Sequence, residues 1–381
     1  MREEPRARGT GRDDVTVHRV EDRESGLRAV IALDTPLLGP AVGGCRMRAY
    51  PHEAAAIEEA RALARAMSRK VLLAGLPFAG GKAVIRADPR TDKTAALWAA
   101  FARALERLGG RYWTGEDSGT TPADMDAIAR GSRYVLGRSA GAGDLGPMTA
   151  LGVLRGLRVA LRHRLGSDRL EGVRVAVQGL GAVGMPLATF LAEAGARLLV
   201  SDLDPAKLAN AVDRLGARPV PPEAILEVEA EVLAPCALGG AIGPFEVDRL
   251  RCAVVAGAAN NPLATPETAV LLHRRGILYA PDYVINAGGV IAATAELDPG
   301  GYDPDRVRAR LSVIDRRLEA ILAEAEARDL PPLVVAEAVA ARLRAERIAA
   351  ATGRRAPGPG RSPAAAAAAS LGPAAQRARS R

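Results

Sequence analysis

Lysine is rare in this chain, and two of the lysines flank a glycine-rich segment. The 52 basic residues comprise 48 arginines and four lysines, namely Lys70, Lys82, Lys93 and Lys207. A guanidinium stays protonated at physiological pH, whereas an amine that loses solvation can release its proton near neutral pH. Lys70 and Lys82 lie 12 residues apart around apolar and glycine residues, so they are candidates for a role that needs a titratable amine. Lys93 and Lys207 lie in polar helix starts and are interpreted as surface residues.

The chain around Lys70 and Lys82 predicts an α/β domain. Apolar, β-favouring runs alternate with segments that have a helical apolar face, and the glycine-bearing stretch 39–44 predicts a turn. The predicted strands are 27–33, 84–87 and 112–115, and the predicted helices are 53–69, 93–108, 122–130 and 149–163. Such alternation is typical of α/β domains. We place this first domain at 15–147.

A second domain begins with a pattern typical of dinucleotide binding. The strand pattern 174–178 is followed by Gly179-Leu180-Gly181-Ala182-Val183-Gly184, by a helix at 185–194 and by a strand at 197–201. In such a βαβ unit the first glycine makes the tight turn, the second admits the pyrophosphate and the third lets helix and strand pack closely. The phosphates then lie at a helix N-terminus. The sequence therefore predicts a Rossmann-type domain, which we place at 148–290.

Asp202 indicates which dinucleotide this domain binds. It follows the second strand, 23 residues after Gly179, where a carboxylate would accept hydrogen bonds from the ribose hydroxyls and repel a 2′-phosphate. Leu203 and Asp204 supply no cation for such a phosphate, so NAD is favoured over NADP. Helix capping is the competing interpretation, and it fits Asp204, which precedes Pro205, better than Asp202.

Further candidate ligand contacts follow the later strands. Predicted strands at 232–234, 254–256 and 277–279 extend a parallel sheet, and open α/β sheets bind ligands at the carboxyl ends of their strands. The residues at these ends include Ala237, Leu238, Asn260, Asn261 and Asn286. A single asparagine is more often a turn former, so the three asparagines count as a group. The segment 291–350 contains helical stretches at 305–328 and 332–348, which are predicted to pack back across the domain boundary.

Charge and composition argue against several classes of protein. Six of the arginines and no acid lie in 351–381, so of the net charge of +8 only 8 − 6 = +2 belongs to the rest. We predict that 1–14 and the basic tail 351–381 are disordered, and nucleic-acid binding through the tail is the less favoured alternative. No apolar run reaches the roughly 18 residues of a membrane span, and 1–14 lacks the apolar core of a secretory signal. We therefore expect a cytoplasmic protein, and the scattered cysteines and histidines predict neither disulfides nor a metal site.

Six motifs occur in a fixed order along the chain. They are Gly43-Gly44-Cys45-Arg46-Met47, Ala79-Gly80-Gly81-Lys82, Gly115-Glu116-Asp117-Ser118-Gly119-Thr120-Thr121, Ala234-Pro235-Cys236-Ala237-Leu238-Gly239, Ala258-Ala259-Asn260-Asn261 and the segment 280–289. Together with Lys70 and the dinucleotide-binding segment, they resemble the leucine, phenylalanine and valine dehydrogenase branch of the glutamate dehydrogenase superfamily. The resemblance covers 15–350 and leaves only the two ends of the chain outside it.

This resemblance implies reversible oxidative deamination of an L-amino acid to a 2-oxo acid and ammonia, with NAD as hydride acceptor, in a homo-oligomer. It implies that Lys82 activates the attacking water and that Asp117 exchanges protons with the departing amine. The substrate carboxylate would contact Lys70, Gly43, Gly44 and Asn261. The cofactor would contact Thr149 through its nicotinamide amide, residues 179–184, Asp202, Ala237, Leu238, Asn260 and Asn286.

The resemblance also places four residues beside the substrate side chain, namely Val42, Gly115, Val290 and Ala293. All four are small or apolar, so a second substrate carboxylate would be buried without a cation, which is energetically costly. The sequence therefore favours a hydrophobic, leucine-like amino acid, with an aromatic one, phenylalanine or tryptophan, as the alternative. A catalytically degenerate NAD-binding regulatory protein is a further alternative, and it predicts loss of Lys82 or Asp117, both of which are present.

Overall fold

The structure is a computed structural model that describes residues 2–3, 15–237 and 239–353. It divides into two compact units. Among the described residues, the first unit contains 2–145, 290–307 and 343–353, and the second contains 146–289 and 308–342. Most of 1–14 and of the basic tail lies outside the described residues, so their predicted disorder stays a prediction, but Arg2–Glu3 form a short strand. No helix among the described residues is both long and apolar enough to cross a membrane.

The first unit is built on a mixed six-stranded sheet with the order β1-β2-β3-β5-β4-β6. Its strands are β1 (Arg2–Glu3), β2 (Thr16–Asp22), β3 (Leu27–Leu33), β4 (Ala41–Arg48), β5 (Ala79–Arg86) and β6 (Tyr112–Glu116). Strand β4 is parallel to both β5 and β6, whereas β1, β2 and β3 pair in antiparallel fashion. The carboxyl ends of β4, β5 and β6 therefore lie at the same edge of the sheet.

Two glycine-bearing segments of this unit are strands, which corrects the turn predicted at 39–44 and the strand start predicted at residue 84. Gly43 lies within β4, and Gly80 and Gly81 lie within β5 next to Lys82. A Cβ atom on Gly43 would lie 1.8 Å from the Gly81 carbonyl oxygen. These glycines therefore serve the close approach of one backbone to another, which is one of the known uses of glycine inside strands.

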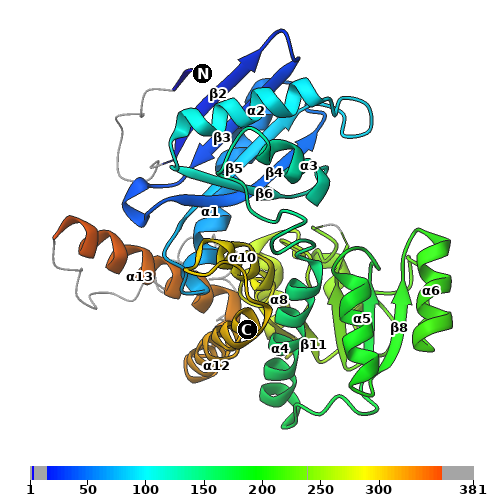
Figure 1. Cartoon of the computed structure of the whole chain (residues 1–381). Helices are drawn as coiled ribbons and strands as arrows, with labels where there is room; N and C mark the ends of the chain where they lie inside the picture. The colour runs from blue at the N-terminus through cyan, green and yellow to red at the C-terminus, as the bar shows by residue number, and fades with distance from the viewer. Residues whose placement is uncertain (1, 4–14, 238, 354–381) are drawn as a thin grey trace. The chain divides into compact units, whose positions relative to one another are not determined.

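Helices cover both faces of this sheet. They are α1 (Glu53–Leu73), α2 (Ala95–Leu108) and α3 (Pro122–Ala129). Figure 1 shows α2 and α3 on one face, where Phe101 and Leu105 join Ile31 and Ile85 in the larger apolar core. The opposite face packs against alanines of α1, with Ala60 among them. Helix α1 continues four residues beyond its predicted end at residue 69, so that Lys70 lies in its last turn.

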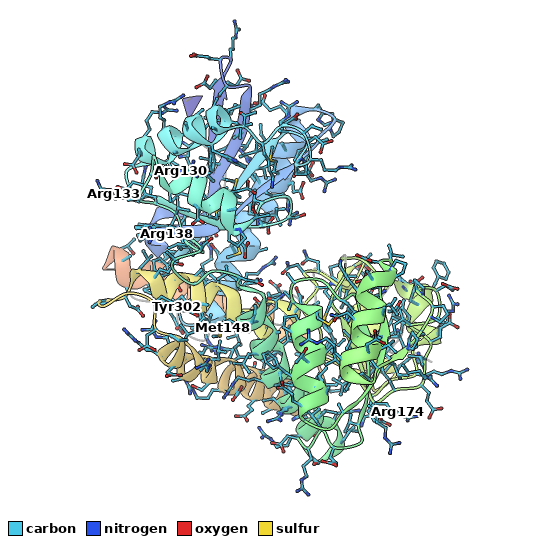
Figure 2. All side chains as sticks on the ribbon, turned by 45° about the vertical axis from the view of Figure 1, so that its right-hand side comes forward. Arg130, Arg133, Arg138, Met148, Arg174 and Tyr302 are labelled. Carbon is cyan, nitrogen blue, oxygen red and sulfur yellow. The ribbon has the colours of Figure 1, made fainter. Side chains whose placement is uncertain are left out.

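The second unit is built on a parallel six-stranded sheet with the order β12-β11-β10-β7-β8-β9. Its strands are β7 (Arg174–Gln178), β8 (Arg197–Ser201), β9 (Arg218–Pro219), β10 (Val232–Pro235), β11 (Val254–Val255) and β12 (Leu278–Tyr279). The chain runs outward from the central β7 in both directions, which is the doubly wound order of dinucleotide-binding domains. Strands β7 and β8 have their predicted bounds. Arg174, labelled in Figure 2, begins β7 and pairs with Glu231 at 2.6 Å.

The helices of the second unit flank this sheet. They are α4 (Gly146–Leu165), α5 (Gly184–Glu193), α6 (Pro205–Leu215), α7 (Pro244–Arg249), α8 (Pro266–Arg274), α9 (Asp282–Ile285) and α12 (Ser312–Ala327). Figure 1 shows α5 and α6 beside β8. Helix α4 begins three residues earlier than predicted, so Thr149 lies in its first turn.

The C-terminal segment differs from its prediction in two ways. The stretch 305–328 is two helices, α11 (Pro304–Arg310) and α12, and the following helix α13 extends over Pro332–Thr352. The segment 291–350 is not a separate part of the fold, because the two units share it. In the first unit, for example, Arg344 pairs with the buried Asp34 at 3.0 Å.

Candidate active site

A buried ion pair joins Lys82 and Asp117. Lys82 lies in the middle of β5, and Asp117 follows the last residue of β6. The distance from Lys82 Nζ to Asp117 Oδ1 is 2.9 Å, and Lys82 as a whole is only 4% exposed. These are the two residues for which the sequence predicted acid–base roles. The parallel arrangement of β4, β5 and β6 brings them together from positions 35 residues apart in the sequence.

A third charged residue, Arg46 on β4, completes this group, and its role was not predicted from the sequence. Its Nε lies 2.7 Å from Asp117 Oδ2, and its terminal nitrogen lies 2.6 Å from Glu59 Oε1 on α1. The sequence carried one signal for it, namely its position in the motif that begins at Gly43. From that motif, only the glycines were predicted to contact the substrate carboxylate. No role was predicted for Arg46, because its partners lie on other elements.

The surroundings of Asp117 favour its ionised form. Burial by itself would raise the pKa of this carboxyl group, but the positive charges of Lys82 and Arg46 and their hydrogen bonds outweigh burial and lower the pKa below its ordinary value. An opposite charge at hydrogen-bonding distance commonly has this effect. Asp117 is therefore a carboxylate able to accept a proton.

The loop after β6 fixes the backbone of Asp117. The Thr120 hydroxyl accepts a hydrogen bond from the Asp117 amide at 2.9 Å and donates one to the Cys45 carbonyl at 2.8 Å. Gly119 has a φ of +85°, and a Cβ atom there would lie 2.0 Å from the Met47 carbonyl oxygen. Threonine and glycine at these positions thus attach the loop closely to β4.

The Tyr112 hydroxyl bridges strands β4 and β5 beside Lys82, where their backbone pairing is interrupted. This role was also not predicted. The β4–β5 ladder pairs Val42 with Gly80 and resumes only at Cys45 with Ala83. In between, the single proton of the Tyr112 hydroxyl is within hydrogen-bonding distance of the carbonyls of Gly43 and Gly44, 3.0 and 3.1 Å away, and the oxygen accepts from the Ala83 amide at 3.1 Å. Burial raises the Tyr112 pKa, so the hydroxyl remains a hydrogen-bond donor.

The remaining predicted substrate contacts of the first unit lie on its β-strands and helices. Lys70 is half-buried in the last turn of α1, the helix that packs against β5. Val42 is buried on β4, and Gly115 lies on β6. Val290 and Ala293 lie on the short helix α10 (Gly288–Thr294). These four candidate specificity residues, Val42, Gly115, Val290 and Ala293, therefore belong to the same compact unit as Lys82.

A glutamate anchors the segment that follows α10. Glu296 accepts hydrogen bonds from the amides of Gly137 and Ala142, at 2.9 and 2.7 Å. Arg138, labelled in Figure 2, lies 3.9 Å from the same carboxylate. Glu296 thereby connects the end of α10 to the loop after α3 within the first unit.

The glycine loop of the second unit has features that fit a dinucleotide. Gly179 has a φ of +95°, and a Cβ atom on Gly184 would lie 1.9 Å from the Gly179 carbonyl oxygen. At Gly181, by contrast, an added Cβ atom would meet nothing within 4 Å. The loop is thus tightly packed on the protein side and open at its middle glycine, where the pyrophosphate was predicted to approach.

Asp202 lies against this loop. Its two carboxylate oxygens accept hydrogen bonds from the amides of Leu180, at 2.6 Å, and Asp204, at 2.9 Å. Asp204 caps helix α6 through the Ala206 amide, as its position before Pro205 indicated. Burial opposes ionisation of Asp202, but these backbone hydrogen bonds outweigh burial and lower its pKa.

The residues after β10, β11 and β12 include one buried acceptor with an unused oxygen. Asn286 Nδ2 donates to the Ala258 carbonyl at 3.1 Å and to Asn260 Oδ1 at 3.0 Å. Among the described residues, its own Oδ1 has no hydrogen-bond partner although it is buried. A ligand with an N–H group would satisfy this oxygen.

The other candidates of the second unit are individually placed. Ala237 packs against the turn at Gly179, and Leu238 lies outside the described residues. Asn261 is exposed, has a φ of +50° and donates its amide to Asp282 Oδ2 at 2.9 Å. Thr149 follows Met148, whose carbonyl oxygen would lie 1.9 Å from a Cβ atom on Gly288. The start of α4 and the segment after Asn286 are thus in close contact.

The doubly wound sheet defines a Rossmann-type unit in an α/β protein whose other unit holds a buried lysine–aspartate pair. Two family models match the chain, "Glu/Leu/Phe/Val dehydrogenase, dimerisation domain" over residues 13–134 and "Glutamate/Leucine/Phenylalanine/Valine dehydrogenase" over residues 204–355. The chain therefore belongs to the Glu/Leu/Phe/Val dehydrogenase family. It is an amino-acid dehydrogenase, an oxidoreductase that acts on the CH–NH2 group of its donor.

Relatives and solved structures agree over most of the chain. A leucine dehydrogenase of Geobacillus stearothermophilus is 46% identical over 84% of this chain and 88% of that protein. A valine dehydrogenase of Streptomyces albus is 44% identical over 86% of this chain and 91% of that protein. The crystal structure of an L-tryptophan dehydrogenase from Nostoc punctiforme is similar with a TM-score of 0.74 and 36% identity, covering 88% of this chain and 96% of that one.

Proposed function

We propose that this protein catalyses the NAD-dependent oxidative deamination of a branched-chain L-amino acid, with leucine as the favoured substrate. The observation that carries the proposal is the buried pair of Lys82 and Asp117, 2.9 Å apart, in a chain 46% identical to a leucine dehydrogenase. A homo-oligomeric assembly is part of the proposal, because residues 13–134 match the dimerisation domain of the family.

In this mechanism Lys82 takes a proton from the water that attacks the substrate, and Asp117 exchanges protons with the departing amine. The two groups lie within hydrogen-bonding distance, so a proton can pass between them without a diffusing base. Burial of Lys82 keeps bulk water away from this exchange. Lys70 binds the substrate carboxylate through charge, with help from Gly43, Gly44 and Asn261.

NAD, when bound, supplies the acceptor for the hydride that leaves the substrate Cα. The open side of Gly181 would receive its pyrophosphate. A carboxylate oxygen can accept more than one hydrogen bond, so Asp202 would also accept from the ribose hydroxyls. The unpaired Oδ1 of Asn286 would accept from the nicotinamide amide, with Thr149, Ala237, Leu238 and Asn260 as the other proposed contacts.

The preference for an aliphatic side chain depends on the four residues beside it. Val42 and Val290 are β-branched and suit leucine or valine, whereas Gly115 and Ala293 leave more room. An aromatic substrate is the second candidate, favoured by two observations. A Cβ atom on Gly115 would meet only the Leu136 carbonyl oxygen, 3.7 Å away, and a similar structure is a tryptophan dehydrogenase.

A spectrophotometric screen of NAD reduction at alkaline pH, with each common L-amino acid, tests the proposal. We expect the highest kcat/KM with leucine and lower values with valine and isoleucine. If kcat/KM is highest with phenylalanine or tryptophan, the preferred substrate is aromatic and the proposed preference for leucine is wrong. Formation of no NADH with any amino acid would contradict it and favour an NAD-binding regulatory protein.

Substitution Gly115→Ala is expected to change specificity without disturbing the fold. The added methyl group fits on β6 but takes up space beside the proposed substrate side chain. A methyl-sized change in a hydrophobic pocket is worth about 1–3 kcal/mol, so kcat/KM for phenylalanine should fall at least about tenfold relative to leucine. Initial rates with both amino acids measure this. An unchanged ratio would place Gly115 outside the substrate pocket.

Substitution Asp202→Asn is expected to weaken NAD binding selectively. A neutral amide cannot accept hydrogen bonds as a carboxylate does, and loss of one charge-assisted bond corresponds to about tenfold or more in affinity. The KM for NAD should rise by this factor while kcat stays within about twofold. Asp204→Asn is the matched control, since Asp204 caps α6 and has no proposed ligand contact. Equal effects of the two substitutions would argue against a ribose contact for Asp202.

A further inference from the structure

Arg46 is the charged member of its motif for which the proposed mechanism has no role. It lies on β4, between the carboxylate of Asp117 at the end of β6 and the carboxylate of Glu59 on α1. Its side chain is 19% exposed, and that of Glu59 is 24% exposed. Two carboxylates on different elements thus bind one mostly buried guanidinium.

The contacts of Arg46 constrain Asp117 strongly. Arg46 Nε lies 2.7 Å from Asp117 Oδ2, and Lys82 Nζ lies 2.9 Å from Asp117 Oδ1. With a cation on each oxygen, the carboxylate cannot rotate without breaking an ion pair. The planar guanidinium is well suited to this task, because its donors lie in a rigid fork.

Glu59 holds the other end of the guanidinium. Its Oε1 lies 2.6 Å from the terminal nitrogen of Arg46. Arg48, two residues further along β4, lies 3.8 Å from the same carboxylate, but its side chain is 59% exposed. The result is a chain of alternating charges that runs from Lys82 through Asp117 and Arg46 to Glu59.

We propose that Arg46 is a positioning residue for the deamination reaction, held by Glu59 and in turn holding Asp117 so that Oδ1 faces the amine of Lys82. This inference rests on the proposed function, in which Asp117 exchanges protons with the departing amine. Arg46 contacts no reacting atom in this role. It acts through the orientation and the charge state of Asp117.

The pH dependence of turnover reports on this role. Charged and titratable groups approach Asp117 from three strands: Lys82 from β5, Arg46 and Cys45 from β4, and Tyr112 and Glu116 from β6. Of these, Lys82 and Arg46 are the cations that lower the Asp117 pKa against the effect of burial. Removal of the Arg46 charge raises that pKa, so protonation of Asp117, which stops it from accepting the proton of the amine, begins at a higher pH.

The test compares pH profiles of kcat and KM for wild type, Arg46→Gln, Arg46→Lys, Glu59→Gln and Arg48→Gln, with the substrate found in the amino-acid screen. Arg46→Gln should lower kcat about 100-fold, since small misplacements of a catalytic group have effects of this size. The acidic limb of the pH profile of kcat should move to higher pH in this variant. The KM for the amino acid should stay within about threefold, because Lys70 is untouched.

The other variants separate charge from geometry. Arg46→Lys should return the acidic limb toward its wild-type position but recover kcat only in part, because an ammonium cannot span both carboxylates as a guanidinium does. Glu59→Gln should lower kcat about fivefold without moving the limb upward, because a neutral amide holds the guanidinium less tightly. Arg48→Gln is the matched control and should stay within about twofold of wild type, as exposed ion pairs contribute little.

Thermal unfolding of each variant identifies a merely structural role. A lower melting temperature for Arg46→Gln with wild-type kcat and acidic limb would overturn the inference while leaving the proposed function intact. If Arg46→Gln does not fold, Arg46→Lys and Glu59→Gln decide by the same criterion, and wild-type profiles for both would overturn it. Absence of NADH formation by the wild type with every amino acid would overturn the proposed function and this inference together.

Discussion

Replacement of Lys82 by alanine is expected to lower kcat by about 1,000-fold, within the range that general acid–base catalysis contributes. The amine is the group that takes the proton from water in the proposed mechanism, and no other lysine of this chain lies on β5. NAD affinity should not change, because the proposed NAD contacts belong to the second unit. Asp117 keeps Arg46 as its partner. Initial rates and the Kd of NAD, measured by calorimetry, test both parts.

Two further lysine variants make this experiment specific. Lys82→Arg keeps a positive charge at the site but removes the titratable amine, so it should be as inactive as Lys82→Ala. Lys93→Ala is the matched control, because Lys93 also forms an ion pair with a largely buried aspartate of the first unit, 2.6 Å from Asp124 Oδ2. It should lose stability but retain kcat. High activity of Lys82→Arg would refute the role of Lys82 as a base.

Replacement of Gly43 by alanine is expected to be the most damaging single change to the sheet of the first unit. The added Cβ atom would lie 1.8 Å from the Gly81 carbonyl oxygen, so β4 and β5 would have to separate beside Lys82. Overpacking of this kind costs about 3 kcal/mol of unfolding free energy. Turnover should fall as well, because the Tyr112 hydroxyl would lose its place between the strands. Urea unfolding and kcat/KM measure the two effects.

Gly115→Ala serves as the control for this experiment. Gly115 lies on the neighbouring strand β6, in register with Gly44, but a Cβ atom there meets nothing closer than 3.7 Å. The unfolding free energy should therefore be unchanged or higher by about 0.5 kcal/mol, since alanine restricts the unfolded chain more than glycine does. Comparable stability losses for Gly43→Ala and Gly115→Ala would show that the close approach of β4 and β5 is not the cause.

The sequence by itself determined the first βαβ unit of the second domain. Strands β7 and β8 have their predicted bounds. In the turn between them, Gly179 and Gly184 are closely packed and Gly181 is open, as predicted. All of these features lie within one βαβ unit of about 30 residues, where neighbours in sequence are also neighbours in space. Errors in the predicted bounds of such a unit are small, because few distant contacts influence it. The predicted acid–base roles of Lys82 and Asp117 came from the family resemblance rather than from local pattern.

Only the tertiary structure decided how the residues around Lys82 are arranged. Gly43, Gly80 and Gly81 look like turn residues in sequence, but they lie in strands. There an added Cβ atom would meet the Gly81 carbonyl oxygen, helix α1 and the Tyr112 ring, respectively. Arg46 and Tyr112 meet their partners across strands that are distant in the chain, and local pattern contains no information about such pairs. The order β5-β4-β6 places Arg46 beside Asp117 and Asp117 beside Lys82. The chemistry of this site is therefore a property of the sheet: the sequence identified Lys82 and Asp117, but the roles of Arg46 and Tyr112 depend on the order of the strands.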